Sequence, residues 1–159
     1  MRLPWGSRSL PADAAVTLEP GERVLVHAPT GTGGLVVVTD RALHLPDSTP
    51  LPWHHIDRAH WDQEGLTVTT TDGTTHRVLV PTPGRVPEAV RERVTSSILV
   101  SRHIRLTDQG GVRLVARRVP QKDTAEWDLH FDPGLNPTDP GLRAAADQAL
   151  ESLRRTMGV

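Results

Sequence analysis

The sequences LVVVTDRALHL (residues 35–45), LPWHHIDRAHW (51–61) and LTVTTTDGTTHRVLVP (66–81) decide the fold. Short runs of β-branched and apolar residues alternate there with turn residues, and Asp72-Gly73 is a strong signal for a two-residue hairpin. The predicted strands cover residues 23–27, 35–39, 42–45, 51–61 with a break at Pro52, 66–71 and 75–80. This spacing predicts an antiparallel meander of six strands.

The hydrophobic period changes after the meander. Apolar residues recur every four positions from Val86 to Ile98, which predicts an amphipathic helix over residues 87–102 with Pro87 in its first turn. Such a helix can cover the open end of a curved sheet.

A second hairpin is predicted from residues 112–119 and 126–131, where apolar and polar side chains alternate. The first of these strands carries arginines at 117 and 118, and the second carries Glu126 and Asp128. Their opposite charges suit cross-strand pairing. A C-terminal helix is then predicted from its N-cap at Asp139 to Gly158.

The expected fold class is therefore α+β and mainly β. It is an antiparallel curved sheet or partial barrel with one helix after the sixth strand, followed by an added β-hairpin and a C-terminal helix. Residues 1–17, rich in Pro, Gly and Ser, are predicted to be a flexible lead-in. Residues 18–159 are predicted to form a single domain, of which residues 103–159 are a hairpin-helix extension.

Three segments carry a resemblance to a known family: PGERVL (20–25), LVVVTDRALHL (35–45) and LPWHHI (51–56). Together they resemble the bacterial pleckstrin-homology-like (PH-like) domains, in which similar motifs precede a closing helix. The resemblance covers residues 20–102 and implies a PH-like fold for them. The whole chain also resembles a set of uncharacterised small actinobacterial proteins, and this resemblance implies no activity.

Composition limits the function classes. The chain has 159 residues, a formal net charge of −1 and no cysteine, which excludes disulfides, thiolate metal sites and a cysteine nucleophile. No apolar run reaches the roughly 18 residues of a membrane span, and the first ten residues lack the apolar core of a signal peptide. We expect a soluble cytoplasmic protein that does not insert into a membrane.

Catalytic motifs are missing. The sequence contains neither a Gly-x-Ser-x-Gly elbow nor a His-Glu-x-x-His motif. The glycines at 31, 33 and 34 precede a strand rather than a helix and have no Lys nearby, so we interpret them as a hairpin loop and not a phosphate loop. We predict a protein that is not an enzyme and has no cofactor.

Three of the eight histidines, His54, His55 and His60, lie close together in the sequence. His54 and His55 point to opposite faces if the segment is extended, and six strand residues separate His54 from His60 by about 20 Å. We therefore predict no metal site, although the sequence leaves open whether these histidines have a role.

Charge is unevenly distributed along the chain. Residues 84–122 carry net +6, between residues 1–83 at net −3 and residues 123–159 at net −4. The basic segment contains a candidate surface for an anion or a partner, formed by Arg102, Arg105, Arg113, Arg117 and Arg118. The favoured interpretation is that these arginines compensate acidic neighbours within the fold.

The predicted function is a non-enzymatic cytoplasmic binding or scaffold module for a protein partner. The alternative is binding of nucleic acid or another polyanion through the Arg-rich segment 102–118. Lesser alternatives are small-ligand binding, including a lipid headgroup, and an enzyme whose site is not visible in the sequence. The sequence identifies neither the partner nor the oligomeric state.

Overall fold

The computed structural model describes residues 10–11 and 14–158, and the chain divides into two compact units, Met1–Ser97 and Ile98–Val159. We call these the N-terminal unit and the C-terminal unit. Most of the predicted lead-in, residues 1–9 and 12–13, lies outside the described residues. The C-terminal unit begins at Ile98, five residues before the predicted start of the extension at 103.

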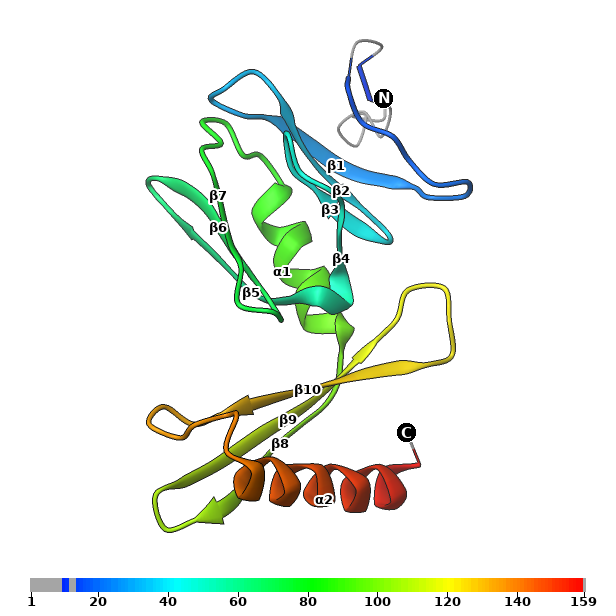
Figure 1. Ribbon diagram of the computed structural model, residues 1–159. Coiled ribbons are helices and arrows are strands. Elements are labelled where there is room, and N and C mark those ends of the chain that lie inside the picture. The colour runs from blue at the N-terminus through cyan, green and yellow to red at the C-terminus, as the bar shows by residue number, and fades with distance from the viewer. Residues whose placement is uncertain (1–9, 12–13, 159) are drawn as a thin grey trace. The chain divides into compact units, whose positions relative to one another are not determined.

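The N-terminal unit contains two antiparallel sheets (Figure 1). The first sheet has the order β1-β2-β3-β4, with β1 at Val24–Pro29, β2 at Leu35–Thr39, β3 at Ala42–His44 and β4 at Leu51–Pro52. The second has the order β5-β6-β7, with β5 at Ile56–Asp62, β6 at Gly65–Thr70 and β7 at Thr75–Val78. The antiparallel meander is confirmed within each sheet, where consecutive strands pair, but it is interrupted between β4 and β5, which belong to different sheets.

One predicted strand is divided in two. The segment 51–61 forms β4, then the short 3-10 turn η1 at Trp53–His55, then β5. Pro52 lacks a backbone N–H, so the ladder stops there and the chain turns into the second sheet. The helix consequently follows a seventh strand rather than a sixth.

The core of the N-terminal unit lies between its sheets and helix α1 (Val86–Ser97), which contacts β1, β2, β5 and η1. The side chains of Val36, Leu43, Ile56, Val68 and Val90 are fully buried in it. Neither sheet of this unit closes into a barrel within the described residues.

The C-terminal unit contains one antiparallel sheet, in the order β10-β9-β8, and helix α2 (Figure 1). The strands are β8 at Ile98–Thr107, β9 at Gly110–Arg118 and β10 at Ala125–Phe131. The prediction of helix as far as Arg102 is wrong, because α1 ends at Ser97 and the next residue begins β8. The apolar residues of β8 alternate and pair with β9, and this pairing overrides the four-residue period.

Helix α2 (Pro140–Met157) has the predicted ends. The Asp139 side chain accepts hydrogen bonds from the backbone N–H of Gly141 at 2.9 Å and of Leu142 at 3.3 Å, and Gly158 ends the helix in the left-handed conformation. One face of the helix packs on the sheet of β8, β9 and β10 through Ala146, Ala149, Leu150 and Leu153.

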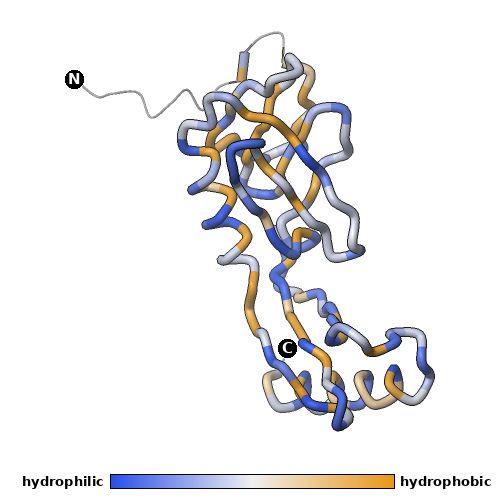
Figure 2. The backbone as a smooth tube through the Cα atoms, turned by 90° about the vertical axis from the view of Figure 1, so that its left-hand side faces the viewer, coloured by the Kyte–Doolittle hydropathy of each residue, from blue (hydrophilic) through white to orange (hydrophobic). Residues whose placement is uncertain are grey.

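Apolar segments alternate with polar ones along both units (Figure 2). Within the described residues, no helix has the length and hydropathy needed to cross a membrane.

Candidate functional site

A pocket of about 1020 Å³ lies at one end of the first sheet. Two hairpin loops and one upstream segment form its walls. The β1–β2 loop contributes residues 32–35, the β3–β4 loop contributes 44–50, and the segment 14–17 together with Pro11 completes the lining. The volume is at the upper end of the range typical of ligand sites in proteins.

The β1–β2 loop is held in place by its own hydrogen bonds. The backbone N–H of Thr30 donates to the carbonyl of Gly34 at 2.8 Å, and the N–H of Gly34 donates back to the Thr30 hydroxyl at 3.1 Å. The N–H of Gly31 donates to the carbonyl of Leu79 at 2.8 Å, which ties the loop to the end of β7. This wall of the pocket is therefore formed before any ligand arrives.

The two loops also contact each other closely. A Cβ atom added to Gly34 would lie 2.8 Å from Cβ and Cγ of Pro46. Glycine at position 34 is thus required for the close approach of the β1–β2 and β3–β4 loops.

Beside the pocket, Glu22 and His44 form a buried pair. Nε2 of His44 lies 2.8 Å from Oε2 of Glu22, and their side chains are 8% and 3% exposed. His44 also lines the pocket. The imidazole therefore lies between the protein interior and the pocket.

Both oxygens of the Glu22 carboxylate accept hydrogen bonds. Its Oε2 also accepts the Thr39 hydroxyl at 2.5 Å, and its Oε1 accepts the backbone N–H of Glu19 at 2.9 Å. Burial raises the pKa of the Glu22 carboxyl, but the hydrogen bonds from Thr39, His44 and Glu19 outweigh burial and hold the pKa below its ordinary value. Glu22 is therefore a carboxylate at neutral pH.

This protonation state defines the role of the imidazole nitrogen that faces Glu22. A carboxylate only accepts hydrogen bonds, so Nε2 of His44 carries the proton and donates it to Glu22. Ser48 also lines the pocket, and its hydroxyl donates to the carbonyl of Thr49 at 3.1 Å.

The five predicted arginines lie in the C-terminal unit and do not form one surface. Leu114 of β9 packs against α2, and Arg102 lies directly opposite it on β8. Arg118 is separated from Leu114 by an even number of strand residues, so its side chain points to the same face. Both arginines therefore lie on the sheet face that α2 covers. The other three, Arg105, Arg113 and Arg117, lie on the opposite face by strand alternation.

Two of these arginines have partners within their own unit. The guanidinium of Arg105 donates to the carbonyls of Thr107 at 3.1 Å and Asp108 at 2.9 Å. The side chain of Arg117 is 1% exposed, and its Nε lies 3.6 Å from Oδ2 of Asp128. The predicted cross-strand pairing is therefore present in β9 and β10, where Glu126 lies directly opposite Arg117.

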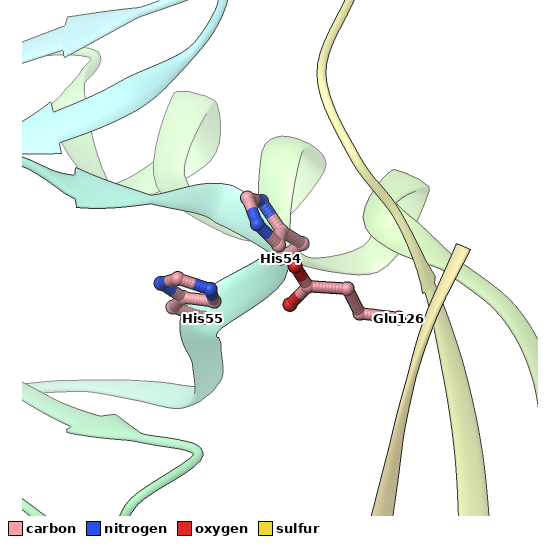
Figure 3. Close-up of side chains that lie close together, drawn as sticks. All are labelled: His54, His55 and Glu126. Atoms are coloured by element: carbon pink, nitrogen blue, oxygen red, sulfur yellow. The ribbon is translucent and has the colours of Figure 1, made fainter. Parts of the chain in front are cut away.

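The sequence expectation for His54 and His55 assumed an extended chain. Both residues instead lie on η1, which brings their ring centroids to 4.1 Å (Figure 3). Glu126, also drawn in Figure 3, comes from β10 of the C-terminal unit. His60 lies on β5 with its side chain 72% exposed, 3.6 Å from Asp62.

Sequence analysis missed the pocket and did not single out Glu22, His44 or Asp47. The available signal was weak, namely that Glu22 precedes the first strand and that His44 ends the third. Comparisons of the chain with family models, curated proteins and solved structures gave no significant match.

Proposed function

We propose that the N-terminal unit is a non-enzymatic binding module, and that its pocket receives a segment of a partner protein. The observation that carries this proposal is the pocket itself, with a volume of about 1020 Å³ and one wall formed by the hydrogen-bonded β1–β2 loop. A preformed site costs little conformational entropy on binding.

The lining supports a protein segment better than a polyanion. Of the described lining residues, His44 and Asp47 are the ionisable ones, and neither Arg nor Lys is among them. A phosphate or a nucleic acid needs cationic donors, which this lining does not offer. Loop backbone, threonine hydroxyls and proline rings instead suit the mixed polar and apolar surface of a peptide segment.

The resemblance of residues 20–102 to bacterial PH-like domains also supports the proposal. In such folds a sheet provides the rigid support and its loops carry the binding site. Fold analogy is associational, so the pocket and not the resemblance carries the argument. A cytoplasmic location is part of the proposal.

The test is affinity capture from a nuclease-treated lysate with a pair of matched variants. Thr49→Trp places a large side chain at an exposed position of the pocket wall. Thr75→Trp makes the same change at an exposed position of β7, which does not line the pocket. We expect wild type and Thr75→Trp to capture the same partner and Thr49→Trp to lose it.

Two outcomes contradict the proposal. A partner captured equally by both tryptophan variants binds elsewhere than the pocket. Alternatively, the captured proteins are lost after nuclease treatment and are also lost with the double variant Arg102→Ala, Arg118→Ala. That result indicates polyanion binding by the C-terminal unit instead.

A further inference from the structure

Strand β8 has a free edge at which a further strand can pair. It is the last strand in the order β10-β9-β8, and β9 is its one partner strand within the described residues. Of the two edge strands of this sheet it is the longer, with ten residues against seven in β10. Backbone N–H and C=O groups of an edge strand that point away from the sheet have no partner in the ladder.

The side chains along this edge are accessible and partly apolar. Ser101, Arg102 and His103 are exposed in the middle of the strand. Ile98 and Leu99, at its start, are 37% and 40% exposed. A strand added here would therefore cover apolar surface as well as pair backbone groups, and both effects favour its binding.

The charge of β8 has one sign. The strand contains Arg102 and Arg105 and no acidic residue, and the two side chains, three residues apart, point to opposite faces of the sheet. The Arg105 guanidinium donates to the uncharged carbonyls of Thr107 at 3.1 Å and Asp108 at 2.9 Å. Within the part of the chain that the structure describes, no carboxylate forms an ion pair with either arginine. Positive charge thus lies on both sides of the edge.

These charges discriminate between possible occupants of the edge. Two β8 strands paired with each other would bring four arginines together, and like charges on facing strands are destabilising. Charged side chains on an edge strand oppose such pairing between copies of one chain. A strand with Asp or Glu at the facing positions would instead form cross-strand pairs of opposite charge.

We propose that the free edge of β8 binds an extended acidic segment of a partner protein as a fourth strand of the C-terminal sheet. Backbone hydrogen bonds provide the pairing, and Arg102 and Arg105 select acidic side chains. None of the residues of this edge lines the pocket of the N-terminal unit, so the inference does not depend on the proposed function.

The test uses three capped peptides as probes. The first is acetyl-Glu-Val-Thr-Glu-Thr-Val-Val-amide, in which the two Glu residues can face Arg105 and Arg102 in an antiparallel strand. The second has Lys in place of both Glu, and the third is the acidic peptide with every internal backbone amide N-methylated. Each is titrated into the ¹⁵N-labelled full chain. We expect the acidic peptide alone to give saturable shifts and slower hydrogen exchange at the amides of residues 101–105.

Variants of the two arginines isolate the charge. In Arg102→Gln with Arg105→Gln, the acidic peptide should bind roughly 3- to 30-fold more weakly, because two cross-strand charge pairs are lost. Since Arg105 also holds the turn after β8, Arg102→Gln is measured alone and should bind roughly 2- to 5-fold more weakly. The control is Arg143→Gln with Arg155→Gln, which removes the same charge from exposed positions of α2 and should bind as wild type does.

Equal binding of the acidic peptide and its N-methylated form overturns the inference, because charge attraction would then act without strand pairing. An Arg102→Gln chain with wild-type affinity overturns it as well, as does an absence of shifts in β8 with the acidic peptide. A single-stranded DNA oligonucleotide that shifts the same amides and binds more tightly than the acidic peptide assigns this edge to nucleic acid instead.

Discussion

Replacing Glu22 with Gln tests whether the buried pair beside the pocket has the charge state described here. The carboxylate accepts three hydrogen bonds, from Thr39, His44 and the backbone of Glu19. Glutamine keeps one oxygen for Glu19 but turns an NH₂ group toward Thr39. The Thr39 hydroxyl already accepts the N–H groups of Arg41 at 3.1 Å and Ala42 at 3.0 Å, so it has no free lone pair.

The variant thus loses two hydrogen bonds to a charged group. Such bonds contribute about 1.5–3 kcal/mol each in buried sites. His44 can change tautomer and recover part of this by accepting from the new amide. We therefore expect the free energy of unfolding of the N-terminal unit to fall by about 2–4 kcal/mol at neutral pH.

The difference between wild type and Glu22→Gln should also depend on pH. The folded pKa of Glu22 lies below its ordinary value of 4.5, so its stabilising contribution is present above the unfolded value. The contribution is lost as pH falls through the lowered folded pKa, because the protonated carboxyl no longer accepts the charged hydrogen bonds. The two proteins should therefore converge in stability under acidic conditions.

Urea unfolding followed by ¹H–¹⁵N resonances measures each unit separately. The control is Glu88→Gln, at an exposed position of α1, which should match wild type at every pH. An unfolding free energy of Glu22→Gln equal to that of Glu88→Gln at neutral pH would refute the reasoning. A difference between Glu22→Gln and wild type that stays constant into acid would refute the assigned charge.

Three further predictions concern the folds of the two units. In Gly65→Ala, the new Cβ would lie 2.3 Å from the carbonyl oxygen of Val78. The control is Gly73→Ala, where φ is also positive but no atom lies within 4 Å of the new Cβ. Urea unfolding should show that Gly65→Ala loses about 1–3 kcal/mol more unfolding free energy than the control, and equal losses would contradict this. Hydrogen bonds from Thr70, the largest cause, and from Thr74 lower the pKa of Asp72 to about 2. Thr70→Val should therefore move the carboxyl ¹³C titration of Asp72 part of the way toward 3.8, and an unchanged midpoint would contradict the assigned cause. Asp139→Ala removes the N-cap of α2 and should lower the unfolding free energy of the C-terminal unit by about 1 kcal/mol, as measured by urea unfolding. No measurable loss would show that the cap does not stabilise this unit.

Much of the fold could be predicted because its signals are local. The alternation in residues 66–71 and the Asp72-Gly73 turn define β6 and β7 without reference to the rest of the chain. The caps of α2 at Asp139 and Gly158 are equally local.

The start of β8 could not be read from the sequence in this way. The apolar period of α1 continues through Ile98, and no Pro or Gly separates the helix from the strand. The helix ends where the Ser97 hydroxyl donates back to the carbonyl of Val94 at 2.6 Å, and pairing with β9 then determines the strand. Ile98, at the start of β8, pairs with Arg117 near the far end of β9, so the start of the strand depends on a residue distant in the sequence.

The candidate site was not predictable for a related reason. Glu22 and His44 are 22 residues apart, and their contact depends on how the 19–22 turn meets the β2–β3 hairpin. The pocket depends on two loops and an upstream segment whose positions are set by sheet order. In contrast, the pairing of Arg117 with β10 was predictable, because hairpin register follows from the alternation of both strands.

Site-specific photo-crosslinking tests the binding role of the pocket most directly. The chain has no cysteine, so Thr49→Cys and Thr75→Cys each introduce one thiol that takes a benzophenone maleimide. After irradiation in a nuclease-treated lysate, we predict a discrete protein adduct from position 49, in the pocket wall, and none from position 75, on β7. The same adducts from both positions, or none from position 49, would contradict the claim that this pocket receives a partner protein.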